Sequence, residues 1–95
     1  MRKSFAASLC WYGAHGGGLY ADDRGLVFRA QKLTLPDELK NIRMPYSDIK
    51  AVARCRSFVF PAVSILLESG REYKFIVFAR KRLLRILSGK ITTTV

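Results

Sequence analysis

The chain has 95 residues, of which 49% are hydrophobic and 12% aromatic. This length favours one domain over residues 1–95, and the apolar content excludes an intrinsically disordered chain. Lys and Arg number 17 against 7 Asp and Glu, so the formal net charge is +10. Such an excess of basic residues predicts a positively charged surface that faces an anionic partner.

The cysteines and the histidine argue against metal chemistry. Cys10, Cys55 and His15 show neither the spacing of metal ligands nor that of a disulfide framework. We expect two buried thiols in a reducing compartment, with no metal and no cofactor.

No segment predicts a membrane span or a secretory signal. The longest uncharged apolar stretch, residues 58–67, has ten residues, and about twenty are needed to cross a bilayer. The apolar run near the N-terminus is short and interrupted by Ser8, which is too little for a signal peptide. We expect a cytoplasmic chain. Its basic residues also allow peripheral contact with the inner membrane surface.

The N-terminal part of the chain predicts strands. Apolar side chains recur at every second position, as on one face of a strand, at Phe5, Ala7, Leu9 and Trp11. Residues 19–30 predict a hairpin, because apolar alternation lies on both sides of the turn residues 22–25. Residues 31–41 lack a sustained period and predict a longer surface connection.

Residues 41–55 predict two short strands joined by a sharp turn. The first strand is expected to stop at Pro45, because proline has no N–H for the ladder. The side chains of Ser47 and Asp48 are expected to bond nearby backbone amides, and Ile49 and Val52 to return the chain to the core.

The C-terminal part predicts a hairpin followed by a helix. Residues 61–78 alternate on both sides of Ser69-Gly70, a favoured hairpin turn. Residues 79–90 change to helical spacing, with a leucine-rich stripe, outward Lys81, Arg82 and Arg85, and Gly89 as the terminating residue. The core is expected over about residues 4–88, with residues 89–95 as a tail or an edge strand.

These elements predict a mainly β fold. Six or seven short antiparallel strands form a strongly bent sheet or split barrel, and the single C-terminal helix covers one open end. The expected interior is formed by Phe5, Leu9, Leu26, Phe28, Ile65, Phe75 and Leu87.

Three segments together resemble the GRAM branch of the pleckstrin-homology-like superfold. They are GGGLYADDRGLVF, IRMPYSDIKAV and SILLESGREYKFIVFARKRLLRIL, which follow the order and spacing of that family over about residues 16–88. A looser resemblance to short stand-alone bacterial GRAM-like proteins, including a group found with mannose phosphotransferase operons, rests on WYGAHGGG and Pro61. The resemblance implies a PH-like binding module for phospholipids or protein partners. It makes Pro45, Tyr46 and Ile49 core and turn positions, and Phe75 and Phe78 barrel core.

Catalysis finds little support in the sequence, and we expect no enzyme and no catalytic residue. His15 has no nucleophile or carboxylate at a recognisable spacing, and Asp22 and Asp23 are typical of a solvated turn. Residues 13–18, GAHGGG, lack the lysine of a phosphate loop and lead into a strand, so we interpret them as a mobile turn.

The basic residues form the candidate ligand-binding surface, made of Arg80, Lys81, Arg82, Arg85, Arg54 and Arg56. An anionic lipid surface or a protein partner is the predicted ligand, and an ordinary solvated face is the structural alternative. The functional alternative is a small basic regulatory or nucleic-acid-associated protein, although no aromatic residues interleave with these charges in an RNA-recognition pattern. Phe58 and Phe60 are predicted to form an association edge, open to a partner or to a second copy, if they lie on an edge strand.

Overall fold

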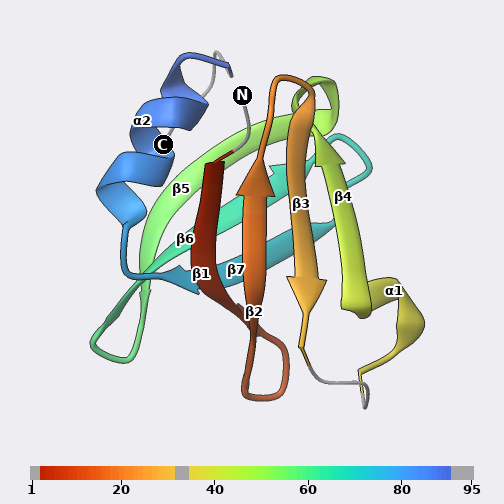
Figure 1. Cartoon of the computed structure of the whole chain (residues 1–95), viewed down its shortest axis with the longest axis vertical. Helices are drawn as coiled ribbons and strands as arrows, with labels where there is room; N and C mark the ends of the chain where they lie inside the picture. Colours follow the sequence, from red (N-terminus) through yellow and green to blue (C-terminus); the bar gives the residue numbers. More distant parts are fainter. Residues whose placement is uncertain (1–2, 32–34, 91–95) are drawn as a thin grey trace.

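The computed structural model describes residues 3–31 and 35–90. Its strands are β1 Lys3–Cys10, β2 Ala14–Ala21, β3 Gly25–Ala30, β4 Asn41–Pro45, β5 Ile49–Ser57, β6 Phe60–Leu67 and β7 Glu72–Val77. Its helices are α1 Asp37–Lys40, the 3-10 turn η1 Tyr46–Asp48 and α2 Arg80–Ser88. The strands form one antiparallel sheet in the order β4-β3-β2-β1-β7-β6-β5. The predicted bent antiparallel sheet with a C-terminal helix is confirmed (Figure 1).

Strand β1 joins the two parts of the sheet. It pairs with β2 along its whole length and with β7 only from Ala7 to Leu9. The sheet therefore bends at β1, so that β5, β6 and β7 cross behind the first four strands, and α2 lies beside β1 and β5 (Figure 1). The helix covers the side of the molecule that the bent sheet leaves open.

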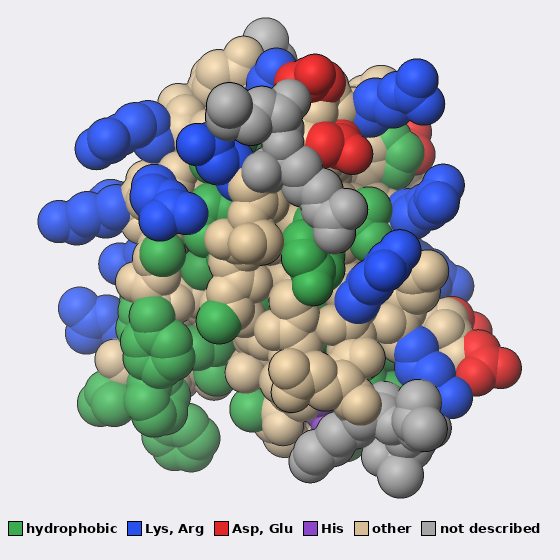
Figure 2. Space-filling view, in the orientation of Figure 1, with side chains coloured by type: hydrophobic (Ala, Val, Ile, Leu, Met, Phe, Trp, Pro, Cys, Tyr) green, Lys and Arg blue, Asp and Glu red, His purple; other side chains and the backbone are tan. Residues whose placement is uncertain are grey.

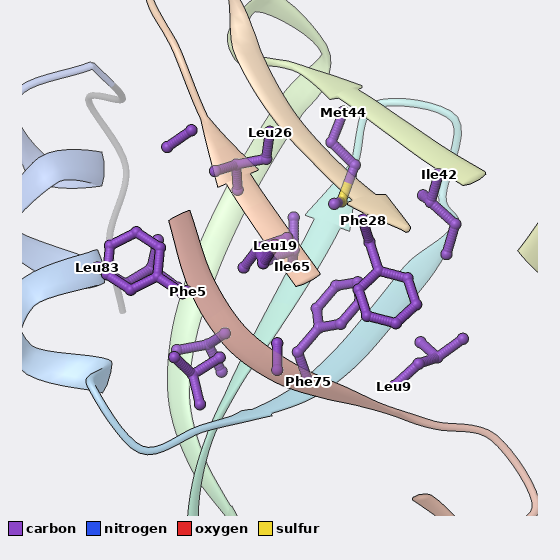
Figure 3. Close-up of a cluster of buried hydrophobic side chains, with 14 of the residues drawn as sticks. Phe5, Leu9, Leu19, Leu26, Phe28, Ile42, Met44, Ile65, Phe75 and Leu83 are labelled. Atoms are coloured by element: carbon purple, nitrogen blue, oxygen red, sulfur yellow. The ribbon is translucent and has the colours of Figure 1, made fainter. Parts of the chain in front are cut away.

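The core fills the concave side of the sheet (Figure 3). The rings of Phe28 and Phe75 meet at its centre with 5.1 Å between centroids. Leu83 and Leu87 of α2 are buried against the same cluster, as the helical stripe predicts. All seven residues expected in the interior are buried: Phe5, Leu9, Leu26, Phe28, Ile65, Phe75 and Leu87.

The junction after β4 turns by a different mechanism from the one expected. The chain forms the 3-10 turn η1, and neither cap of this turn is made by a side chain. Instead the Tyr46 backbone N–H donates to the Arg24 carbonyl at 3.0 Å, and its phenol donates to the Asp22 carbonyl at 2.8 Å. A bulge between Ile49 and Ala51 then resets the alternation of β5. The prediction that Ser47 and Asp48 would bond nearby amides was wrong, because Tyr46 fastens the junction to the β2–β3 turn.

Two other segments differ from expectation. The glycine-rich residues 14–18 are part of β2 and not a mobile turn. A Cβ on Gly17 would lie 2.2 Å from the Arg29 carbonyl oxygen of β3, so glycine is needed where these strands approach closely. The predicted connection over residues 31–41 contains the helix α1, and residues 32–34 lie outside the described chain. Of residues 89–95, expected as a tail or an edge strand, Gly89 and Lys90 form a turn after α2, and residues 91–95 lie outside the described chain.

One strand position and two burial predictions were wrong. Trp11, expected on the same strand face as Phe5, Ala7 and Leu9, follows the last residue of β1 and is exposed at the turn. Phe78 is 70% exposed and not barrel core, because β7 ends at Val77 and the chain leaves the sheet there. Cys10 and Cys55 are half-buried free thiols instead of fully buried ones.

Candidate functional site

Helix α2 carries the largest group of basic residues. Its buried residues are Leu83 and Leu87, and Lys81, Arg82 and Arg85 are all exposed, as the spacing predicts. The helix contains no acidic residue, so its own sequence does not neutralise this charge. The packing of one stripe against the core therefore holds the cations at the surface.

Arg80 joins this helix to the basic part of β5. Its Nη1 donates to the Cys55 carbonyl oxygen at 2.8 Å. Cys55 lies between Arg54 and Arg56, which continue the row of the buried Val52 beyond the end of the core and are exposed. The two basic groups of the sequence therefore meet in the fold. We call this surface, made of Arg54, Arg56, Arg80, Lys81, Arg82 and Arg85, the basic face.

The six residues of the basic face are not equivalent. The Arg82 guanidinium carbon lies 5.0 Å from the centroid of the buried Phe5 ring, a cation–π contact that holds α2 to β1. Arg80 is half-buried, and its Nε is a buried nitrogen without a partner among the described residues. The other four cations make no ion pair within residues 3–31 and 35–90: Lys81, Arg85, Arg54 and Arg56. These four cations are the ones most available to a partner.

The acidic residues lie elsewhere. All seven are outside β1, β2, β5, β6 and α2, at Asp22, Asp23, Asp37, Glu38, Asp48, Glu68 and Glu72. The ion pairs of the described residues join Lys40 to Asp37 at 3.1 Å and Lys90 to Asp23 at 3.9 Å, and neither involves the basic face. Figure 2 shows Lys and Arg side chains along the side of the molecule formed by α2 and β5. The positive charge on this side is therefore only partly compensated, by Glu72 of β7, which lies near Cys55 and accepts a hydrogen bond from Ser64.

An exposed apolar cluster borders the basic face. Phe58 and Val59 form the two-residue turn between β5 and β6 and are 94% and 84% exposed. Phe60 contacts Phe78 edge to face, with 5.8 Å between ring centroids. Phe58 lies in a turn and not on a strand, and Phe60 pairs with Ser57 of β5, whereas the pairing of β6 with β7 begins at Ala62. Association through Phe58 and Phe60 stays a prediction. These apolar residues protrude as a tip below the basic side chains (Figure 2).

The side chains with acid–base chemistry serve the fold. His15 Nε2 lies 2.8 Å from the Trp11 carbonyl oxygen and fastens the β1–β2 turn. The Asp22 carboxylate accepts the backbone N–H groups of Arg24 and Gly25 at 2.8 and 3.0 Å, and these bonds lower its pKa. Desolvation raises the pKa of the Cys55 thiol, although Lys74 and Arg80 oppose the rise. His15, Asp22 and Cys55 lie in three different elements or turns of the described chain.

Two grooves are lined by residues 20–29 and 43–45, away from the basic face, and a third reaches Phe78 of the apolar cluster. An open groove of about 380 Å³ runs beside β3 and β4, lined by Asp22, Arg24, Gly25, Leu26, Val27, Arg43, Met44 and Pro45. The basic face itself is a patch on a helix and a strand. It is therefore suited to an extended anionic surface more than to one small enclosed ligand.

Comparison with known proteins supports the fold and no more. No protein-family model matches the chain, and no curated protein matches it. A solved structure, the C-terminal domain of an unknown protein from Leishmania infantum, is similar over 93% of this chain and 80% of its own, with a TM-score of 0.76. The two sequences are 15% identical, so the likeness concerns the fold alone. Within the described residues, no helix is long and apolar enough to cross a membrane.

Sequence reasoning missed how the parts of this surface join. The hydrogen bond from Arg80 to Cys55 joins residues 25 positions apart, and no periodic pattern indicates it. Phe58 and Val59 were visible as apolar residues, but their place in a turn was hidden because the segment lacks the usual Gly, Asn or Asp.

Proposed function

We propose that the protein is a non-enzymatic GRAM/PH-like binding module that engages an anionic membrane surface through the basic face. The observation that carries the proposal is the Arg80–Cys55 hydrogen bond, which unites the cations of α2 and β5. A surface of cations that form no ion pair within the described residues fits the phosphate and carboxylate groups of an anionic bilayer.

The strength and character of this binding follow from its electrostatics. Each Lys or Arg close to an anionic membrane contributes about 1 kcal/mol. The attraction is screened over about 8 Å at physiological ionic strength, so binding is expected to be salt-sensitive and weakly selective among anionic headgroups. Nucleic-acid phosphates offer the same charge, but that alternative rests on the net charge of +10 alone.

The test is co-sedimentation with vesicles. The protein is mixed with phosphatidylserine-containing vesicles and, separately, with neutral phosphatidylcholine vesicles. We expect binding to the anionic vesicles that weakens as salt rises. A Lys81→Glu/Arg85→Glu variant removes two exposed cations without touching the Arg80 or Arg82 contacts, and it should bind at least tenfold more weakly.

A matched control separates a local surface from net charge. Arg29→Glu/Arg43→Glu makes the same change, from +10 to +6, at two exposed positions of β3 and β4 away from the basic face. This control should lose much less binding than the Lys81→Glu/Arg85→Glu variant. Equal losses in both variants, or no binding by the unchanged chain, would contradict the proposal. Retention of duplex or single-stranded nucleic acid without vesicle binding would favour the alternative.

A further inference from the structure

Two turn residues combine an unusual backbone conformation with a large exposed side chain. Among residues 3–31 and 35–90, Tyr12 and Phe58 are the non-glycine residues with positive φ, at 49° and 56°. Their side chains are 93% and 94% exposed. Bulky residues rarely adopt this conformation, and hairpin turns normally place Gly, Asn or Asp there. At both positions a large aromatic ring is held in water at a cost to the fold.

Each of these rings belongs to a small apolar cluster. Tyr12 meets Trp11 edge to face with 5.0 Å between centroids, and Phe58 precedes Val59 at the β5–β6 tip beside Phe60 and Phe78. The β1–β2 and β5–β6 turns both lie at the lower end of the molecule in Figure 1. We call this set, made of Trp11, Tyr12, Phe58, Val59, Phe60 and Phe78, the aromatic end.

We propose that the aromatic end inserts into the interfacial layer of an anionic bilayer while the basic face binds its headgroups. This inference rests on the proposed function and adds an orientation and a depth to it. Tyr and Trp rings favour the membrane interface, and Phe favours the acyl chains beneath it. Two separate tips would fix the tilt of the molecule on the membrane in a way that charge alone does not.

The charges beside the β5–β6 tip favour a membrane over a second copy of the chain. Arg56 pairs with Pro61, one residue pair from the Phe58-Val59 turn, and Arg54 follows two residues behind. Strands β1, β5 and β6 and helix α2 contain no acidic residue, and Glu72 of β7 lies at the end of that strand opposite to Phe78. Self-association through the tips would bring the arginines of two copies together, whereas an anionic bilayer neutralises them.

A depth measurement tests the insertion. Trp11→Phe combined with Phe58→Trp places the single tryptophan of the chain at the β5–β6 tip. On phosphatidylserine vesicles with brominated acyl chains, the fluorescence of this tryptophan should shift to the blue and be quenched. The matched reporter, Trp11→Phe combined with Ser69→Trp, lies in the exposed β6–β7 turn and should remain unquenched. A bound protein with an unquenched tip tryptophan would overturn the insertion and leave the proposed function intact.

A second variant separates apolar insertion from charge. Tyr12→Gly/Phe58→Gly removes both rings at positions where glycine suits the backbone, so the fold should be kept. Vesicle binding should fall by about tenfold for each ring removed. The loss should affect the part of the binding that survives high salt, while Lys81→Glu/Arg85→Glu removes the salt-sensitive part. Unchanged binding by the glycine variant overturns the insertion. A concentration-dependent dimer that dissociates in this variant, without vesicle binding, overturns both proposals.

Discussion

The two ends of the molecule use their turns in opposite ways. At the upper end in Figure 1, the β2–β3 turn is closed by the Asp22 carboxylate and fastened to η1 by the Tyr46 phenol. At the lower end, the β5–β6 turn places Phe58 in a strained conformation and in water. The first turn follows the chemistry that stabilises hairpins, and the second departs from it.

This difference shows where the fold tolerates a loss of stability. Backbone strain persists where something other than stability maintains it, and such sites are often functional. The upper end holds Asp22, Asp23 and Asp48 and joins strands that are distant in sequence. The lower end carries exposed aromatic residues and borders the basic face. The upper end is therefore the structural closure of the sheet, and the lower end is the candidate working surface.

The sharpest contrast is between a core phenylalanine and a tip phenylalanine. Phe75 is fully buried against Phe28, and Phe75→Ala should lower the free energy of unfolding by roughly 3 to 5 kcal/mol. Phe58→Ala removes no buried contact and should change stability by less than about 0.5 kcal/mol. Urea unfolding followed by circular dichroism measures both. A Phe75→Ala variant with an unchanged midpoint would place that ring outside the core.

A second substitution breaks the upper end alone. A Cβ on Gly25 would lie 2.6 Å from the Met44 carbonyl oxygen and 2.6 Å from Pro45 Cα, both backbone atoms of the paired strand. Gly25→Ala should therefore cost about 1 to 3 kcal/mol of stability. Gly16→Ala is the matched control, because its nearest atom would be the Gln31 side-chain oxygen at 3.9 Å. If both variants melt at the same temperature, close packing at Gly25 is not what closes this end.

The Tyr46 phenol provides a pH-dependent test of the same end. Its hydrogen bond to the Asp22 carbonyl makes Tyr46→Phe cost about 1 kcal/mol at neutral pH. Desolvation, with Asp22 and Asp23 nearby, raises the pKa of Tyr46 above its usual value near 10. The unfolded chain thus loses this proton first, so the contribution is complete below pH 10 and is lost as pH rises through the folded pKa. Thermal melts from pH 8 to 11 should show a steeper decline for the natural chain than for Tyr46→Phe, and parallel curves would contradict this assignment.

The sequence predicts the periodic parts of this structure and not the contacts between distant segments. Alternation identified the strands, and helical spacing identified α2 with Leu83 and Leu87 inside. The Arg80–Cys55 bond and the Tyr46 anchor depend on how the sheet bends, which no local pattern specifies. The basic residues of the candidate site were visible from charge, because charge needs no fold to be counted. Only the structure shows that they form one face and that the strained tips lie beside it.

The smallest expected effect concerns the turn that departs from hairpin chemistry. The left-handed conformation of Phe58 costs about 1 to 2 kcal/mol, and glycine removes that cost while losing about 0.5 to 1 kcal/mol through the freedom of the unfolded chain. Phe58→Gly should therefore raise the free energy of unfolding by about 0.5 kcal/mol, or the melting temperature by about 2 to 4 °C. Phe60→Gly, two residues away in β6 where φ is not positive, is the matched control and should lower stability. If Phe58→Gly melts below the natural chain, the exposed ring is a stabilising part of the fold, and the contrast between the two ends disappears.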